Sequence, residues 1–254
     1  KLAVSTVTIF GLGAGGSLLA LQLARAGIGR LRLVDPAVIR AENVIRHVGG
    51  LESIDRLKVL VSSENVLRHN PYVVIDAYGI DPFNPESQID PEILFEGADL
   101  IIAATDRVGA QLMINDYAWR LRVPGVFGGC YEEARGGEVF FTLPAEGTPC
   151  LACLRAGLAV PESESPFDYS SAGRAEDYHG EPGFSAAVDL VTNIEAQIAL
   201  GILLRGSGST LADVIRPEFN FLLIGGPLGA GYYRFKRPYH IFWQPLTGPR
   251  PGCA

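Results

Sequence analysis

The sequence predicts an α/β protein with a Rossmann-like, mixed but mostly parallel sheet flanked by helices. Three observations support this prediction. A strand-like run, residues 7–11, leads through the glycine-rich turn GLGAGG into a run with helical spacing. Strand-like and helical runs then alternate, which is typical of a parallel sheet with right-handed crossovers. The C-terminal part, residues 218–246, alternates like antiparallel strands after a long irregular run.

Each element follows from its local pattern. Runs rich in β-branched and aromatic residues predict strands at 7–11, 30–35, 72–79, 98–106, 124–132 and 136–144. Apolar residues at helical spacing, often followed by glycine, predict helices at 17–29, 54–68, 107–122 and 184–206. Residues 145–183 have little regular period and many Pro, Gly and Ser, and this run is much longer than an ordinary connection. We therefore expect a functional or irregular loop there.

Composition excludes several classes of protein. The chain has 254 residues, of which 48% are hydrophobic and 19% charged, so a disordered tail is a poor interpretation. The net charge of −7, without a basic stripe, argues against nucleic acid as a partner. Residues 2–24 carry no charge, but their glycine-rich turn would weaken a membrane helix. We expect a cytoplasmic protein without a membrane partner, and a further segment upstream of residue 1.

The turn GLGAGG places Gly11, Gly13 and Gly16 between a strand and a helix. Such glycines let backbone N–H groups approach a phosphate, whose negative charge the helix N-terminus favours. Asp35 lies about 20 residues further on, where a carboxylate can accept hydrogen bonds from ribose hydroxyls. The pattern indicates a nucleotide site, although a tight turn without ligand remains an alternative. The motif alone does not separate NAD, FAD, SAM and ATP.

Four charged or polar residues favour a triphosphate. Arg46 and Lys58 can hold phosphate oxygens, and Asp106 can bind Mg²⁺ at the carboxyl end of a strand. Asn43 lies between Asp35 and Arg46 in the sequence. Taken singly, Arg46 is explained by a surface ion pair, Lys58 by a solvated helix position and Asp106 by a helix N-cap. The order in which they occur together favours the functional interpretation.

In that order, these residues resemble the ThiF/MoeB adenylyltransferase superfamily, which includes the ubiquitin-activating enzymes. The likeness extends through NP at residues 70–71, ATD at 104–106, GTPCLAC at 147–153 and the irregular run, so it covers essentially the whole chain. The pair Arg46–His47 and the run GGCYEEARGGEVF are closer to bacterial members linked to ubiquitin-like conjugation. Members of cofactor biosynthesis usually have RQ at this position.

The resemblance implies a reaction and its residues. Asp35 binds the ribose, Asn43, Arg46 and Lys58 contact the phosphates, and Asp106 binds Mg²⁺. The C-terminal tail of a ubiquitin-like protein threads under a crossover loop near residues 161–182. Its carboxylate, with a pKa of roughly 3.3–3.7, is already a nucleophile at pH 7 and attacks the α-phosphorus of ATP. Catalysis is then positioning and charge neutralisation by Arg46, Lys58 and Asp106.

The resemblance also implies an organisation. Residues 1–254 form a single adenylation domain, with a nucleotide-binding half at 1–143 and a half at 144–254 for the crossover loop and the carrier protein. We expect a homodimer or a pseudo-symmetric heterodimer, and possible contact with a conjugating enzyme. Ala37 and Ala103 stand where family members often have acids. The upstream segment that often supplies an arginine finger is not in this sequence.

Cysteines suggest a second metal. Cys150 and Cys153 form C-x-x-C, Cys253 can be a third ligand, and a fourth would lie beyond it, because structural zinc takes four ligands. A redox pair or two plain buried thiols are the alternatives. Cys130 follows an apolar strand, and we expect it to be buried packing. Since residues 154–252 contain no cysteine, we expect no acceptor cysteine in the crossover loop.

Three other functions stay open at this stage. The same chemistry would activate a ThiS/MoaD-like sulfur-carrier protein. A non-catalytic half of a heterodimeric activator is a different class, and the presence of Arg46, Lys58 and Asp106 argues against it. A hydride-transferring Rossmann enzyme is a more distant alternative.

Overall fold

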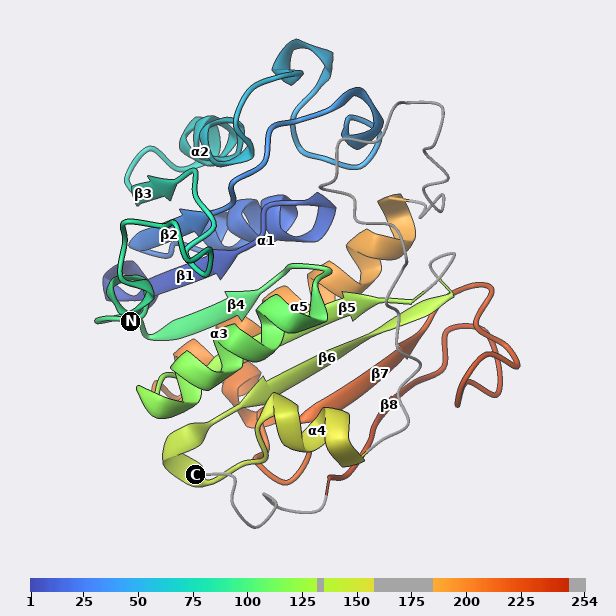
Figure 1. Cartoon of the computed structure of the whole chain (residues 1–254). Helices are drawn as coiled ribbons and strands as arrows, with labels where there is room; N and C mark the ends of the chain where they lie inside the picture. The colour runs from blue at the N-terminus through green and yellow to red at the C-terminus, as the bar shows by residue number, and fades with distance from the viewer. Residues whose placement is uncertain (132–134, 158–184, 247–254) are drawn as a thin grey trace.

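The computed structural model describes residues 1–131, 135–157 and 185–246. Its centre is one eight-stranded sheet with the strand order β3-β2-β1-β4-β5-β6-β7-β8 (Figure 1). The strands are β1 (Thr6–Phe10), β2 (Arg30–Val34), β3 (Val74–Tyr78), β4 (Leu100–Ala103), β5 (Gly125–Cys130), β6 (Gly136–Thr142), β7 (Phe221–Gly225) and β8 (Ile241–Trp243). Strands β3 to β5 in this order pair in parallel, and β5 to β8 pair antiparallel. The predicted fold class is confirmed.

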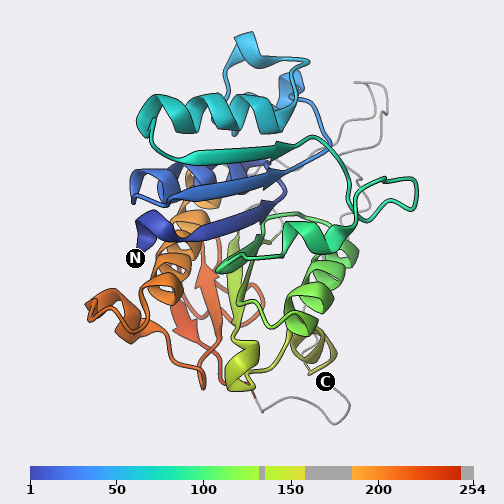
Figure 2. The same cartoon turned by 90° about the vertical axis from the view of Figure 1, so that its left-hand side faces the viewer.

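Helices cover both faces of the sheet. They are α1 (Ala14–Arg25), α2 (Lys58–His69), α3 (Val108–Arg120), α4 (Leu151–Gly157) and α5 (Ser185–Leu204). Helices α1, α2 and α5 pack on one face, and α3 and α4 on the other (Figures 1 and 2). Within the sheet, β1 lies between its parallel neighbours β2 and β4. Because the three strands are parallel, their carboxyl ends meet at one edge.

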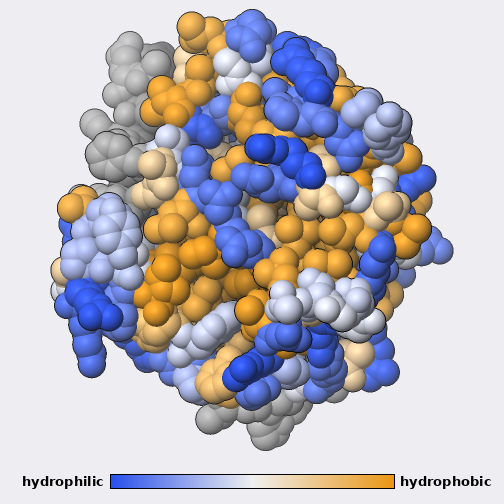
Figure 3. All heavy atoms as spheres, turned by 180° about the vertical axis from the view of Figure 1, so that it is seen from behind, coloured by the Kyte–Doolittle hydropathy of each residue, from blue (hydrophilic) through white to orange (hydrophobic). Residues whose placement is uncertain are grey.

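Each face of the sheet has its own hydrophobic core. Along the fully buried strand β6, Val139 and Phe141 belong to the core under α1 and α5, whereas Phe140 belongs to the core under α3 and α4. This alternation follows from the two-residue period of a strand. By length and composition α5 could cross a membrane, but half of its most apolar window is buried in the core. Apolar side chains also reach the surface on this side of the molecule (Figure 3).

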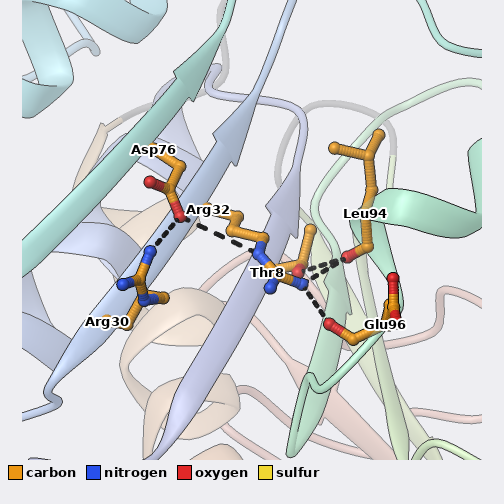
Figure 4. A network of polar contacts seen from close by, with 6 residues as sticks. All are labelled: Thr8, Arg30, Arg32, Asp76, Leu94 and Glu96. Carbon is orange, nitrogen blue, oxygen red and sulfur yellow. Dashed lines mark hydrogen bonds and ion pairs between the residues drawn. The ribbon is translucent and has the colours of Figure 1, made fainter. Parts of the chain in front are cut away.

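Polar contacts fix the entry into β4. The Thr8 hydroxyl donates to the Leu94 carbonyl at 2.7 Å, and Arg32 Nη1 donates to the Glu96 carbonyl at 2.6 Å (Figure 4). Arg32 in turn lies 3.9 Å from a carboxylate oxygen of Asp76 on β3. Three neighbouring strands and the turn before β4 are thereby held in register. The pairing of Phe10 with Val34 and with Ala103 places the ends of β1, β2 and β4 side by side, where the candidate site lies.

The structure differs from the sequence prediction in two helices. Helix α2 begins at Lys58 and not at residue 54, because Asp55 has a left-handed backbone with φ of 66° and Leu57 forms an antiparallel bridge with Val38. Helix α4 lies in the run that was expected to be irregular. Asn115 Oδ1 accepts a hydrogen bond at 2.8 Å from the backbone N–H of Leu151, the first residue of α4. The predicted crossover loop, residues 161–182, lies outside the described residues.

Candidate nucleotide site

The three motif glycines, Gly11, Gly13 and Gly16, differ in what surrounds them. Two are tightly packed, and one faces open space. Gly11 has a φ of +87°, and a Cβ atom there would lie 2.8 Å from the Ala104 carbonyl oxygen. A Cβ on Gly16 would lie only 1.9 Å from the Gly11 carbonyl oxygen. A Cβ on Gly13, the N-cap of α1, would meet nothing within 4 Å. Gly11 and Gly16 therefore shape the turn, whereas Gly13 leaves room for a ligand at the helix N-terminus.

Asp35 follows β2 and is buried beside this turn. Its Oδ2 accepts a hydrogen bond from the Leu12 backbone N–H at 2.6 Å, and its Oδ1 accepts one from the Ala37 N–H at 2.8 Å. Each oxygen of an ionised carboxylate has a second acceptor position, so a ribose contact is still chemically open. The structure thus gives Asp35 a role that the sequence did not indicate, which is to hold the glycine-rich turn.

His47 holds the same turn from the other side. Its Nε2 lies 3.0 Å from the Leu12 carbonyl oxygen, and its Nδ1 accepts a hydrogen bond from the Gly49 N–H at 2.9 Å. The ring is buried, which lowers the pKa of His47 below 6.5; Lys58 lowers it further, while the Leu12 bond and Asp35 raise it. Sequence analysis gave His47 no role, because a single histidine without a spaced partner carries no recognisable signal.

Asn43 and Arg46 come from the turn before His47. Asn43 Oδ1 accepts a hydrogen bond from the Arg40 N–H at 3.1 Å. The backbone carbonyl of Asn43 accepts from the N–H groups of Arg46 and His47 at 2.9 and 2.8 Å. Arg46 is half-buried and close enough to Cys130, at the end of β5, to act on its thiol. Within the described residues, Arg46 forms no ion pair and no side-chain hydrogen bond.

Lys58 is the first residue of α2, and its backbone N–H donates to the Ala37 carbonyl at 3.0 Å. It is half-buried, and its charge acts on His47. Over the part of the chain that the structure describes, Lys58 also lacks an ion pair and a side-chain hydrogen bond. The charges of Lys58 and Asp35 both act on His47, and Arg46 precedes it in the chain. Their contact with a nucleotide stays a prediction.

Asp106 lies in the loop between β4 and α3 and is exposed. The N-cap of α3 is Arg107, whose backbone N–H donates to Thr105 Oγ1 at 3.3 Å, so Asp106 is not the N-cap. Gln111, buried on α3, donates from its side-chain amide to the carbonyls of Thr105 at 2.8 Å and Gly128 at 3.2 Å. Through these two hydrogen bonds Gln111 links the Asp106 loop to β5, a role that its residue type did not indicate.

Asn70, from the NP pair, has a structural role at the far end of α2. Its side-chain amide donates to the Ala24 carbonyl at 2.8 Å, and its Oδ1 accepts from the Tyr72 N–H at 3.0 Å. These bonds tie the C-terminal ends of α1 and α2 together. Asn70 therefore supports the helix layer on which the site rests.

Cys130 is not the buried packing residue that the sequence predicts. It is the last residue of β5 and is exposed, whereas the first three residues of the strand are buried. Crowding of protein atoms around the sulfur raises the pKa of its thiol to about 12, and Glu195 and Asp189 raise it further against the effect of Arg46. The thiolate is therefore disfavoured at neutral pH.

Glu195, on α5, is buried behind the end of β5. A Cβ atom on Gly128 would lie 2.4 Å from its Oε2, so the glycine makes room for this carboxyl group. In the described part of the chain its Oε1 has no hydrogen-bond partner. Burial raises the pKa of Glu195 to about 8, so the group is mostly protonated at neutral pH.

The predicted zinc ligands are partly described. The sulfur atoms of Cys150 and Cys153 lie 3.8 Å apart at the start of α4, with Cys150 buried and Cys153 half-buried. Cys253 lies outside the described residues. Among residues 1–131, 135–157 and 185–246, no group of three or more His, Cys, Asp or Glu side chains could hold a metal ion.

This arrangement defines an α/β protein with a candidate phosphate site at the carboxyl edge of its sheet. The glycine-rich turn opens a helix there, and the His47 ring, on which the charge of half-buried Lys58 acts, contacts the turn at Leu12. The chain belongs to the ThiF family, which it matches over residues 1–219. The expected family is confirmed.

Named relatives agree with this assignment. The sulfur carrier protein adenylyltransferase of Thermus thermophilus is 32% identical over 233 residues, which cover 88% of this chain and 80% of that protein. The ThiS adenylyltransferase of Escherichia coli is 30% identical over 64% of this chain and 62% of its own length. Ubiquitin-like modifier-activating enzyme 5 of Arabidopsis thaliana is 28% identical over 58% of this chain, but only 37% of its own length is covered.

A solved structure shows the same fold. The crystal structure of E. coli MccB with ATP superposes with a TM-score of 0.70 at 16% identity, covering 100% of this chain and 67% of MccB. The identity is too low to transfer residue roles. This chain matches only 37% of the A. thaliana enzyme and 67% of MccB, so both proteins are considerably longer than the stretch that they share with it.

Proposed function

We propose that this chain is an ATP-dependent adenylyltransferase that activates the C-terminal carboxylate of a ubiquitin-like protein. The observation that carries the proposal is the pair Arg46 and Lys58. Arg46 precedes His47, whose ring contacts the glycine-rich turn at Leu12, and the charge of Lys58 acts on that ring. Both cations are half-buried, and within the described residues neither has an anionic partner. A partly buried charge without a partner is unfavourable, so the site is suited to a strongly anionic ligand. A triphosphate supplies that charge.

The proposed chemistry needs positioning more than proton transfer. The carrier's carboxylate is ionised at neutral pH and attacks the α-phosphorus, while the bond to the β-phosphate oxygen breaks and pyrophosphate leaves. Arg46 and Lys58 neutralise the charge on the phosphates, and the glycine-rich turn supplies backbone N–H groups. Asn43 would contact the phosphates through its side-chain amide. Asp35 would accept from the ribose with the acceptor positions that Leu12 and Ala37 leave open.

Asp106 suits a magnesium ion bound together with ATP. Carboxylate oxygens are hard ligands, and Mg²⁺ usually binds one or two of them together with phosphates and water. Asp106 is exposed on a loop that packs against Gly11 through Ala104, so its carboxylate can reach the same edge. When bound, the ion would offset phosphate charge. Gln111 would keep the Asp106 loop in place.

The cysteine pair suits a structural zinc ion. Two sulfurs bound at about 2.3 Å to one tetrahedral ion are about 3.8 Å apart, which is the separation of Cys150 and Cys153. Cys253 and one further ligand would complete the site. Zinc analysis of freshly purified protein that has met no chelator should give close to one ion per chain. A zinc content near zero would leave Cys150 and Cys153 as plain thiols or a redox pair.

The carrier protein is the second point to decide. The T. thermophilus relative, matched over most of both chains, favours a sulfur carrier as an alternative substrate. The sequence features around His47 favour a ubiquitin-like protein that is conjugated. Either tail would use the same site. Any thioester would form outside these 254 residues, in a flanking domain or on a conjugating enzyme. Residues 154–252 lack cysteine, Cys150 and Cys153 would bind zinc, and the raised pKa of Cys130 disfavours its thiolate.

Nucleotide binding tests the proposal first. Calorimetric titration with ATP in the presence of magnesium should show binding, and titration with NAD should show none. Carrier-dependent ATP–pyrophosphate exchange then tests the reaction, with ThiS as one carrier and co-purified small proteins, identified by mass spectrometry, as others. Tight binding of NAD without binding of ATP would refute adenylation and favour hydride transfer.

A further inference from the structure

We infer that His47 is a positioning residue of the nucleotide site: as a neutral imidazole it locks the glycine-rich turn to the segment that carries Asn43 and Arg46. The inference rests on the proposed function, since the ligand whose binding it would control is ATP. It adds a residue to which the proposed chemistry assigns no contact with substrate. It also adds a response of the site to pH.

The lock acts on both backbone polar groups of one residue, the N–H and the carbonyl of Leu12. Leu12, inside the turn, donates its N–H to Asp35 Oδ2 at 2.6 Å, and its carbonyl oxygen lies 3.0 Å from His47 Nε2. The turn is thereby held from two sides by buried side chains. Since backbone N–H groups of this turn would face the phosphates of a bound nucleotide, a rotation at Leu12 would misdirect them.

The same ring fixes the neighbouring segment. His47 Nδ1 accepts from the Gly49 N–H at 2.9 Å, and the His47 N–H donates to the Asn43 carbonyl at 2.8 Å. Gly49 is buried and closely packed, since a Cβ atom there would lie 2.7 Å from Val61. Arg46 stands between these anchors, so the position of its guanidinium group relative to the glycine-rich turn depends on the ring.

The hydrogen bonds define the protonation state. Because Nδ1 accepts from Gly49, it carries no proton, and a neutral ring must carry its proton on Nε2, which donates to Leu12. A second proton, on Nδ1, would face the Gly49 N–H and remove its acceptor. Leu12 would keep its bond, but the ring would no longer be held on both sides. The lock therefore requires the neutral form.

The charges around the ring favour that form at neutral pH. Burial is the main reason that the pKa of His47 lies below 6.5, and Lys58 on α2 adds to it. Asp35, after β2, opposes them. The lock is complete well above the pKa and is lost as the pH falls through it. ATP affinity should fall in the same interval.

Four variants at two positions test the inference. His47→Gln keeps a donor at the place of Nε2 and cannot be protonated, whereas His47→Asn has polar atoms only near the place of Nδ1. Calorimetry near pH 7.5 should show that His47→Asn and His47→Ala weaken ATP binding by roughly tenfold, the effect of one lost buried hydrogen bond. His47→Gln keeps the Leu12 bond and leaves the Gly49 N–H without an acceptor. Unlike the protonated ring, it places no donor against that N–H, so it should bind ATP within about threefold of wild type. The exposed His69→Gln is the matched control and should bind as wild type.

Lowering the pH to about 5.5 supplies a readout that a merely structural role would not move. ATP affinity of wild type should fall more than that of His47→Gln, because protonation of ATP itself affects both proteins equally. The protection factor of the Gly49 amide, which compares its exchange rate with the intrinsic rate at the same pH, should fall in wild type over the same interval, with or without ATP. Circular dichroism checks that each protein stays folded.

The outcomes separate the two claims. Unchanged ATP affinity in His47→Ala and His47→Asn, or equal pH profiles of wild type and His47→Gln, would overturn the role of His47 and leave the proposed function standing. If wild type and His69→Gln both fail to bind ATP, the proposed function and this inference fall together.

Discussion

Two parts of the candidate site differ in how completely folding satisfies them. Its floor consists of Gly11, Leu12, Asp35 and His47. There the carboxylate oxygens, both ring nitrogens and both polar groups of Leu12 have hydrogen-bond partners within the protein. Its wall consists of Arg46 and Lys58, which are half-buried and, over the described residues, have no partner for their charge.

The difference separates residues that build the site from residues that await a ligand. Floor residues contribute to stability as well as to binding, because their bonds exist without ligand. Wall residues contribute little to stability, and removal of an unpaired charge can even be favourable. Substitutions in the floor should therefore change unfolding and binding together, and substitutions in the wall should change only ligand binding and turnover.

The largest effect is expected from Gly16→Ala, in the glycine-rich turn to which the floor residues Gly11 and Leu12 belong. Its Cβ atom would lie 1.9 Å from the Gly11 carbonyl oxygen, a backbone atom that cannot step aside without opening the turn. Chemical denaturation should show a loss of more than about 3 kcal/mol of unfolding free energy, or no folded protein. Gly13→Ala is the matched control, since nothing lies within 4 Å of its Cβ. Its stability should drop by no more than about 1 kcal/mol. Equal stability of the two variants would remove the distinction between the two glycines.

Glu195 sharpens the comparison, because it is buried behind the floor without a partner for Oε1 among the described residues. Folding raises its pKa from 4.5 to about 8, so between these values the folded state keeps a proton that the unfolded chain has lost. The unfolding free energy should therefore fall as the pH rises through this interval.

Glu195→Gln stays neutral and should remove that decline. Near pH 8 it should be more stable than wild type by on the order of a few kcal/mol, with a difference that shrinks towards acid pH. Denaturation curves between these pH values measure the effect, and the exposed Glu86→Gln serves as the control. A difference between Glu195→Gln and wild type that is the same at every pH would show that Glu195 is not a buried proton holder.

Much of the fold could be predicted because its elements are local patterns. Strands β1, β2 and β4 follow from apolar runs, and their parallel pairing from the helices between them. The start of α2 could not be predicted, since the left-handed Asp55 has no signature in a run with helical spacing. Helix α4 was missed because its seven residues are too few to show a period among Pro and Gly.

The candidate site was predictable where residue type carries the chemistry. Gly11 shapes the turn that the nucleotide interpretation requires, and the role of Arg46 and Lys58 at phosphates stays a prediction. What sequence could not show is which polar atoms the protein uses for itself. Asp35 and His47 both turn towards Leu12, and this depends on the packing of segments far apart in the chain. The prediction for Cys130 was wrong for a related reason: an apolar run does not indicate whether the last residue of the strand is exposed.

The most direct test of the account is carrier-dependent ATP–pyrophosphate exchange by Lys58→Ala. The variant should slow exchange by roughly one to two decades, because a charge-assisted hydrogen bond to phosphate contributes about 1.5–3 kcal/mol. Its unfolding free energy should match that of wild type, and the exposed Lys236→Ala should exchange at the wild-type rate. Unchanged exchange in Lys58→Ala, or a loss that merely follows a loss of stability, would contradict the claim that the wall holds the phosphates of ATP.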